Sequence, residues 1–124
     1  MTVIARLAAV SLDCADPAEL AGFYRDLLGL EQFWESPDFV ALKGAGIYLT
    51  IQRIEDHQPA SWPGGSRPKQ LHLELAVIDL DGAEEQALAL GAVKADIQPS
   101  PDGWRVFLDP AGHPFCFTTL VPEL

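Results

Sequence analysis

Two segments of this chain show the same transition from an alternating strand pattern into a helix start. They are residues 7–16 (LAAVSLDCAD) and residues 70–79 (QLHLELAVID), so the pattern repeats after 63 positions (from 7 to 70). In each segment, apolar residues recur at every second position, as in a strand with one buried face, and an aspartate stands where a helix can begin. A repeat of this kind predicts a fold built from two similar halves.

The two faces of these strands differ in character. The apolar positions, such as Leu12 and Leu73, are expected to face a core. The opposite positions carry Ser11 and Asp13 in the first segment and His72 and Glu74 in the second. These side chains are polar enough to line a cleft. We therefore predict that the two strands are paired walls of one site.

Both halves predict the order strand, helix, strand, strand, strand. Asp16 and Asp79 are predicted N-caps, and Gly29 and Gly91 are predicted helix stops. A stretch rich in proline and glycine separates the halves, which gives a first βαβββ module at residues 1–56, a linker at 57–67 and a second module at 68–124. A module of roughly 55 residues buries little core alone, so the halves are expected to share one sheet system in a single α+β domain. The expected strands are 4–13, 31–35, 39–42, 47–53, 70–77, 93–98, 104–108 and 114–120.

Composition excludes several classes of partner. The chain has 8 basic and 18 acidic residues and a formal net charge of -10, which repels phosphate backbones and favours a cationic small molecule over nucleic acid. It has no run of about 20 apolar residues for a membrane span and no signal-peptide pattern at its N-terminus, so a cytoplasmic location is expected. The two cysteines, Cys14 and Cys116, are expected to be free thiols.

Three stretches carry a resemblance to a known family. They are FYRDLLGLE after the first strand, HLELAVIDLDGAEEQALALGA in the second half and LDPAGHPFCF near the end. Together with the two-fold βαβββ order, they resemble the vicinal oxygen chelate superfamily, which includes glyoxalase I, extradiol dioxygenases, and bleomycin- and fosfomycin-resistance proteins. The resemblance implies a curved mixed sheet, a half-barrel around a cleft with the helices outside. A homodimer is also expected, because half-barrels leave sheet edges that another copy can cover.

The resemblance also implies positions for a metal ion. Metal-dependent members use one residue from the first and one from the last strand of each module, typically His and Glu, which here correspond to Ala9, Thr50, His72 and Cys116. Only His72 matches that pattern, so we expect no tightly bound metal and no other cofactor. If a divalent ion does bind, the expected ligands are His72, Gln52, Glu74 and Cys116.

Residues expected on the cleft-facing register form the candidate site. His72 could act as a base or contact a ligand, and Glu74 could act as a general base or hold a cation; these two are the catalytic candidates. The structural alternatives are a histidine held by Glu74 or Gln52 and a Cys116 that is only a small core residue. The full set of candidate ligand-binding residues is Ser11, Asp13, Tyr48, Thr50, Gln52, Trp62, His72, Glu74 and Cys116.

Three functions are compatible with this pattern. The first is a metal-free protein that binds a small molecule in the cleft, in the manner of drug-sequestering resistance proteins. The second is a metal-dependent lyase or isomerase of the glyoxalase type, or a related dioxygenase. The third is an accessory or regulatory module in which the cleft is vestigial.

Overall fold

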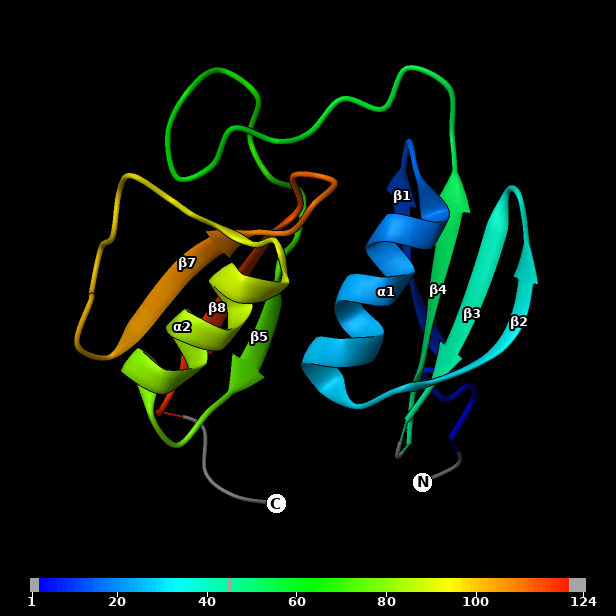
Figure 1. Cartoon of the computed structure of the whole chain (residues 1–124), viewed down its shortest axis with the longest axis horizontal. Helices are drawn as coiled ribbons and strands as arrows, with labels where there is room; N and C mark the ends of the chain where they lie inside the picture. The colour runs from blue at the N-terminus through cyan, green and yellow to red at the C-terminus, as the bar shows by residue number, and fades with distance from the viewer. Residues whose placement is uncertain (1–2, 45, 121–124) are drawn as a thin grey trace. The chain divides into compact units, whose positions relative to one another are not determined.

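A computed structural model describes residues 3–44 and 46–120 of the chain, which divides into two compact units, Met1–His57 and Gln58–Leu124 (Figure 1). Each unit contains one helix and one four-stranded mixed sheet. Unit 1 comprises β1 (Ala9–Cys14), α1 (Pro17–Leu28), β2 (Glu31–Ser36), β3 (Phe39–Lys43) and β4 (Tyr48–Arg53). Unit 2 comprises β5 (Leu73–Ala76), α2 (Leu80–Leu90), β6 (Val93–Lys94), β7 (Trp104–Leu108) and β8 (Pro114–Thr118).

The two sheets have the same topology. In unit 1 the strand order is β1-β4-β3-β2, and in unit 2 it is β5-β8-β7-β6. In both, the first strand pairs in parallel with the last, and the other pairs are antiparallel. The α+β class and the repeated βαβββ order predicted from the sequence are therefore confirmed.

The helix boundaries follow the predicted caps. An oxygen of Asp16 and one of Asp79 each accept a hydrogen bond from a backbone N–H of the first turn, at 3.2 Å and 3.1 Å respectively. These bonds satisfy donors that a helix start would otherwise leave unpaired. Gly29 and Gly91 end the two helices in the left-handed conformation, with φ of 66° and 112°. A side chain at either position would be strained, which explains why glycine stands there.

Each helix covers one face of its own sheet. In unit 1 the fully buried Tyr24 and Leu20 of α1 belong to the same core as Leu42 and Ile51 of the sheet. In unit 2 three phenylalanines of β7 and β8 pack against one another on alternate positions, with ring centroids 5.2 to 5.6 Å apart; they are Phe107, Phe115 and Phe117. The opposite face of each sheet carries no helix in the described part of its unit.

Several strands are shorter than the sequence predicted. β4 begins one residue later than expected, at Tyr48, and β8 ends at Thr118 and not at residue 120. β1 begins at Ala9 and not at residue 4, because its partner β4 begins only at Tyr48, which pairs with Ala9. β5 likewise begins at Leu73, where its pairing with β8 starts, so Leu71 is 61% exposed instead of facing a core. The interpretation of residues 4–8 and 70–72 as strand was wrong.

A side chain replaces the missing end of β6. This strand covers only Val93–Lys94, whereas residues 93–98 were predicted. Beyond it, the Gln98 amide donates to the carbonyls of Val106 and Ala95, at 2.8 and 2.9 Å, and its oxygen accepts from the Val106 N–H at 2.8 Å. The edge of β7 is therefore satisfied by Gln98 without a longer β6.

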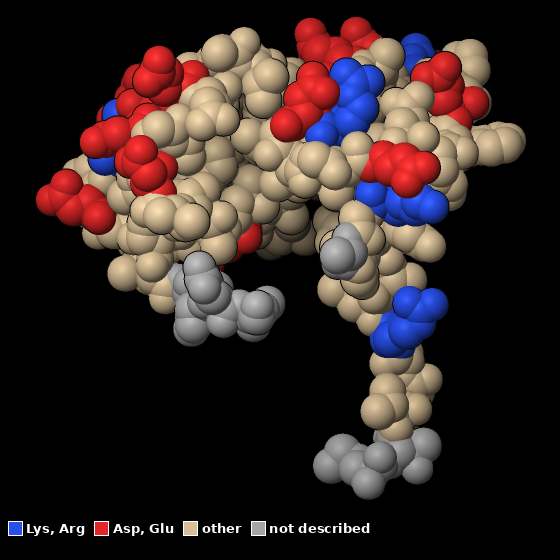
Figure 2. All heavy atoms as spheres, turned by 60° about the horizontal axis from the view of Figure 1, so that its bottom comes forward, with Lys and Arg blue, Asp and Glu red and all other residues tan. Residues whose placement is uncertain are grey.

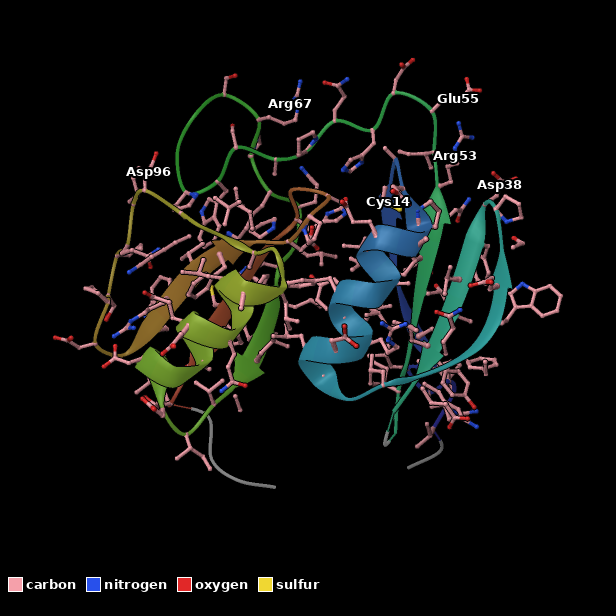
Figure 3. All side chains as sticks on the ribbon, in the orientation of Figure 1. Cys14, Asp38, Arg53, Glu55, Arg67 and Asp96 are labelled. Atoms are coloured by element: carbon pink, nitrogen blue, oxygen red, sulfur yellow. The ribbon has the colours of Figure 1, made fainter. Side chains whose placement is uncertain are left out.

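Residues 58–67, expected to be a linker between the halves, belong to unit 2. Ser61 closes this segment into a loop: its N–H donates to the Arg67 carbonyl, and its hydroxyl accepts from the Arg67 N–H, both at 2.8 Å. The Arg67 guanidinium also donates to the carbonyl of Pro59 at 3.1 Å. Figure 3 labels Arg67 on this segment. The loop thus holds Trp62 against unit 2.

The capping of α1 can be tested by mutation. Asp16→Ala should lower the free energy of unfolding by about 1 kcal/mol, because it leaves a first-turn N–H without its acceptor. Asp16→Ser keeps an acceptor oxygen and is the matched control. Its free energy of unfolding should stay within a few tenths of a kcal/mol of the wild-type value. Urea unfolding followed by circular dichroism measures both. An equal loss of stability in the two variants would show that the hydrogen bond to Asp16 does not stabilise the helix.

Candidate functional site

The helix-free face of the sheet in unit 2 carries a group of polar and aromatic side chains from the candidate set. Glu74 pairs with Cys116 in the β5–β8 ladder, and Cys116 pairs with Val106 in the β7–β8 ladder. Paired residues of neighbouring strands point to the same face, opposite the phenylalanines that α2 covers. His72 lies two residues before Glu74 and therefore reaches the same face.

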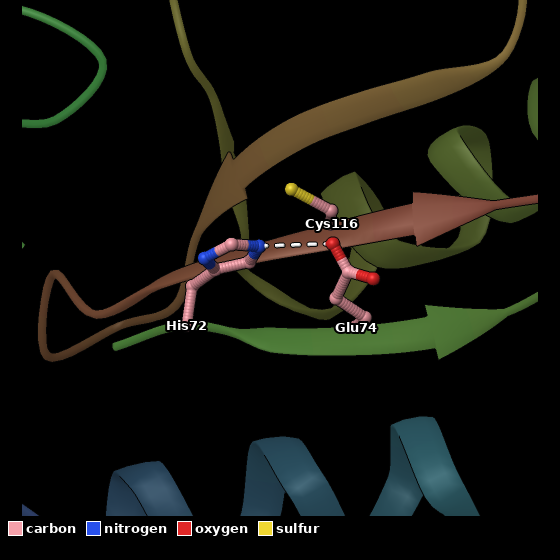
Figure 4. Close-up of side chains that lie close together, drawn as sticks. All are labelled: His72, Glu74 and Cys116. Atoms are coloured by element: carbon pink, nitrogen blue, oxygen red, sulfur yellow. Dashed lines mark hydrogen bonds and ion pairs between the residues drawn. The ribbon is translucent and has the colours of Figure 1, made fainter.

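His72, Glu74 and Cys116 form a compact cluster on this face (Figure 4). The imidazole Nε2 of His72 lies 3.1 Å from a carboxylate oxygen of Glu74, in a hydrogen bond. One donor atom from each of the three residues lies within 4.8 Å of the other two. The three side chains differ in exposure: Glu74 is 58% and His72 22% exposed, while Cys116 is fully buried.

Aromatic side chains frame the cluster. The indole of Trp62 stacks on the His72 ring, with centroids 5.2 Å apart and planes inclined by 19°. The ammonium of Lys69 lies 3.8 Å from the centroid of the Trp62 ring, a close cation–π contact. Trp62 and Trp104 also pack against the core around Cys116. The stacking fixes the orientation of the imidazole without using either of its nitrogens.

A cavity of about 300 Å³ opens beside the cluster. This volume is at the lower end of the range for pockets that hold small organic molecules. Its wall combines two indoles with an imidazole, a carboxylate and a hydroxyl, and it lies wholly within unit 2. The residues that line it are Trp62, His72, Glu74, Trp104, Thr118 and Leu120.

The Cys116 thiol is a poor nucleophile in this setting. Burial raises its pKa to about 11, because an apolar environment disfavours the thiolate, and the negative charge of Glu74 adds to the effect. The Lys69 ammonium opposes the shift but does not cancel it. At neutral pH the residue is therefore a neutral thiol, and nucleophilic catalysis by Cys116 is unfavourable.

The remaining candidates lie on the helix-free face of unit 1. The β1–β4 register pairs Ser11 with Thr50 and Asp13 with Gln52, so these four side chains share a face with Tyr48. The hydroxyls of Ser11 and Thr50 are hydrogen-bonded to each other. The Tyr48 ring contacts Phe33, with centroids 5.5 Å apart. Five of the nine candidates therefore belong to unit 1 and four, namely Trp62, His72, Glu74 and Cys116, to unit 2.

Sequence reasoning missed part of the cavity wall. It favoured Tyr48 and Trp62 over the other aromatic residues, yet Trp104 lines the cavity in unit 2 and Tyr48 does not. Thr118 and Leu120 were also not selected. The sequence could have indicated Thr118, because this residue lies two positions beyond Cys116 in β8 and therefore on the same face.

Comparison with known families identifies the chain. Two βαβββ units with a helix-free sheet face define a protein of the glyoxalase and bleomycin-resistance class. The sequence model of the glyoxalase-like domain family matches residues 9–118, and the chain belongs to this family. A search of curated protein sequences found no match.

Solved structures with the same fold share little sequence identity with the chain. One is a glyoxalase/bleomycin resistance protein/dioxygenase family enzyme from Burkholderia phytofirmans PsJN, with a TM-score of 0.72 and 22% identity over 94% of this chain and 100% of that one. A bleomycin-binding protein from Streptomyces verticillus has a TM-score of 0.62 and 23% identity over 98% and 100%. The fosfomycin resistance protein FosX from Listeria monocytogenes has a TM-score of 0.75 and 18% identity over 96% and 95%. At these identities the likeness establishes the fold alone.

The donors at the positions that the superfamily uses do not suit a metal ion. Ala9 has no donor atom, and the Thr50 hydroxyl is bonded to Ser11. His72 and Cys116 alone supply fewer than the three protein ligands of catalytic zinc sites. Of the four residues expected if an ion did bind, three lie together in unit 2, and Gln52 lies in unit 1. Any site in unit 2 therefore depends on Glu74.

The buried state of both thiols can be tested by alkylation. In the native protein at pH 8, iodoacetamide should modify Cys116 very slowly, because a pKa of about 11 leaves roughly one molecule in a thousand as thiolate. Cys14 is also buried, so both thiols should react only after urea is added. Mass spectrometry of the time course measures this. Fast native labelling of a Cys14→Ser variant would contradict the assignment.

Proposed function

We propose that this glyoxalase-like protein binds a small organic molecule in the cavity of unit 2, without the metal ion that the superfamily resemblance implies. The observation that carries the proposal is the cavity wall, in which Trp62 and Trp104 accompany the His72 imidazole and the Glu74 carboxylate. Pockets that bind drug-sized ligands combine apolar faces with a few polar groups in this way.

The chemistry of the wall favours a ligand with an aromatic part and a positive charge. Indoles offer flat, polarisable faces for stacking and for cation–π contacts. Glu74 supplies a half-exposed carboxylate at the rim, and the formal net charge of -10 attracts cations to the protein. Figure 2 shows the Asp and Glu side chains in several groups, some of them beside Lys or Arg. On the face shown, the acidic side chains are therefore distributed, and Glu74 provides the negative charge at the cavity itself.

The structural neighbours support ligand capture. The Streptomyces verticillus protein was solved in complex with copper(II)-bleomycin, so a protein with this fold can bind an organic ligand. The cavity of unit 2 also speaks against the third hypothesis, a vestigial cleft filled by side chains. A cytoplasmic location remains part of this proposal. None of the helices within residues 3–44 and 46–120 is long and apolar enough to cross a membrane.

A second candidate function is the metal-dependent lyase or isomerase. The cluster of His72, Glu74 and Cys116 favours it, because it brings three donor atoms within 4.8 Å of one another. Listeria FosX was solved with Mn(II) and a phosphonic acid. In such an enzyme, Glu74 or His72 would move the proton.

Ligand binding can be tested with paired variants. Chelator-treated protein should bind planar aromatic cations, and Trp62→Ala should weaken binding about tenfold, the value of one lost stacking contact. Trp34→Ala, which removes a tryptophan 59% exposed in unit 1, is the matched control and should leave affinity unchanged. Calorimetric titration across a panel of aromatic cations and their uncharged analogues measures this. The proposal fails if none of the panel binds, or if both variants behave alike.

We also propose that the protein is a homodimer. The outer strands of unit 1 are β1 and β2, and Phe33 and Trp34 on β2 are 50% and 59% exposed. Open edges and exposed aromatic residues favour association with a second copy. Light scattering at tens of micromolar should give about twice the chain mass of 13.5 kDa. A measured mass near that of one chain would contradict the homodimer proposal.

A further inference from the structure

We propose that unit 2 contains a second binding site, which takes a small aliphatic ammonium ion. The site is a cavity of about 320 Å³, bounded by the loop of residues 61–65 and by residues 95–97, the segment that follows β6. Of the residues that line it, only Trp62 also lines the cavity beside His72 and Glu74. The proposal goes beyond the proposed function and does not rest on it, because a different set of side chains would hold the ligand.

Hydrogen bonds hold both sides of this second cavity in place. The loop is closed by the two 2.8 Å hydrogen bonds between Ser61 and Arg67. The other side is held at Ala95, whose N–H donates to the Val106 carbonyl at 3.1 Å and whose carbonyl accepts from the Gln98 amide at 2.9 Å. The walls therefore need little ordering when a ligand binds, which limits the entropic cost of binding.

The two sides of the cavity approach each other closely at Gly64. A β carbon at position 64 would lie 3.1 Å from the Cδ1 atom of Ile97, which is closer than the roughly 3.5–4.0 Å of a favourable carbon–carbon contact. Gly64 also has a φ of 147°, which other residues seldom adopt. The loop therefore meets residues 95–97 at this point without a side chain of residue 64 between them.

Most of the cavity wall is aliphatic. Pro63, Ile97 and Leu108 contribute saturated side chains, and a single indole completes the apolar part of the wall. Ile97 is 54% exposed, so a ligand that covers it would remove apolar surface from water. The cavity beside His72 instead has two indoles and an imidazole in its wall. A saturated ligand therefore suits the second cavity, whereas a planar aromatic ligand suits the first.

Asp96 supplies the charged group of the second cavity. Figure 3 labels this residue on the segment that follows β6, and its side chain is exposed. Within residues 3–44 and 46–120 its carboxylate forms no ion pair with a basic side chain. A primary ammonium group would supply the missing positive charge, and it stays protonated at neutral pH, as lysine does. The formal net charge of -10 also attracts cations and disfavours anions.

The volume of the cavity limits the size of the ligand. A water molecule takes about 30 Å³ in the liquid, so the cavity has room for roughly ten non-hydrogen atoms. Cyclohexylmethylammonium, a saturated ring with one ammonium group, is within this limit. A ligand of this size with one exposed ion pair should bind weakly, with a Kd of about 1 mM.

The experiment titrates the full chain, labelled for NMR, with cyclohexylmethylammonium at neutral pH and follows the backbone amide signals. The signals of Gly64, Asp96 and Ile97 should shift and reach saturation, and those of Glu74 and Thr118 in the first cavity should not. The uncharged analogue cyclohexylmethanol should cause the same shifts with an affinity about threefold lower, the value of one exposed ion pair. Saturable shifts confined to the first cavity, or no saturable shift at all, would overturn the proposal.

Paired variants test the role of the carboxylate. Asp96→Asn should weaken binding of the ammonium ion about threefold and leave binding of the alcohol unchanged. Asp102→Asn is the matched control, because it removes an exposed carboxylate of the same unit that does not line the cavity. Both variants lower the net negative charge equally, so equal effects on affinity would contradict a local role of Asp96.

A third variant tests whether the ligand occupies the cavity itself. Ile97→Trp places a larger side chain on the wall and should weaken binding of both compounds at least about tenfold, because it fills the space that they need. Circular dichroism checks that the variant folds, which the exposure of Ile97 favours. If it does not fold, the comparison of Asp96→Asn with Asp102→Asn decides. Unchanged affinity in a folded Ile97→Trp protein would overturn the proposal.

The second site can be separated from the proposed function. Because Trp62 lines both cavities, its variants do not distinguish them. Glu74→Gln changes only the first cavity and should leave the affinity for cyclohexylmethylammonium unchanged; a loss as large as that in Asp96→Asn would contradict the assignment. Binding of planar aromatic cations without binding of cyclohexylmethylammonium would reject only this inference. The reverse result, with shifts at Gly64 and Ile97, would reject only the proposed function.

Discussion

The parallel pairing of the first and last strands of each unit is the interaction on which the candidate site depends. In unit 2 it sets Glu74 opposite Cys116, and in unit 1 it sets Ser11 opposite Thr50. Because side chains alternate across a strand, the same pairing places the phenylalanines of β8 on the other face, where α2 covers them. A slip of one residue would exchange the two faces and bury a carboxylate. Burial of the apolar face therefore fixes which polar groups meet.

Local signals in the sequence predicted most of the fold. Asp16 and Asp79 begin helices because a short polar side chain can accept a first-turn N–H, and this chemistry depends only on neighbouring residues. Strand length was less predictable, because a strand ends where its partner ends. The alternation in residues 93–98 favours a strand, yet Gln98 folds back and makes the hydrogen bonds with Val106 that a longer β6 would have made. A side chain that competes with a strand for the same backbone hydrogen bonds cannot be recognised from the local sequence pattern.

The candidate site was predictable where its residues lie close together in the sequence. His72 and Glu74 are two residues apart, and side chains at that spacing share a face in an extended chain, so their proximity follows from the sequence alone. Cys116 joins them through the β5–β8 register, which the repeat suggested. Trp104 was not selected, since its place depends on the pairing of β7 with β8 and on the distance its large side chain spans. The loop that holds Trp62 against His72 was expected only to be a linker between the halves.

The thiol at position 116 fills a buried position on the helix-free face of unit 2 without introducing a charge. A carboxylate buried at this place would carry a charge, and leaving it unpaired would cost several kcal/mol. A thiol avoids that cost, because burial raises its pKa to about 11 and the group stays neutral at physiological pH. The neutral form packs with Ala95 and Val106 as a small apolar residue. Cys116 therefore lets β8 stay buried beneath His72 and Glu74 without an unpaired charge.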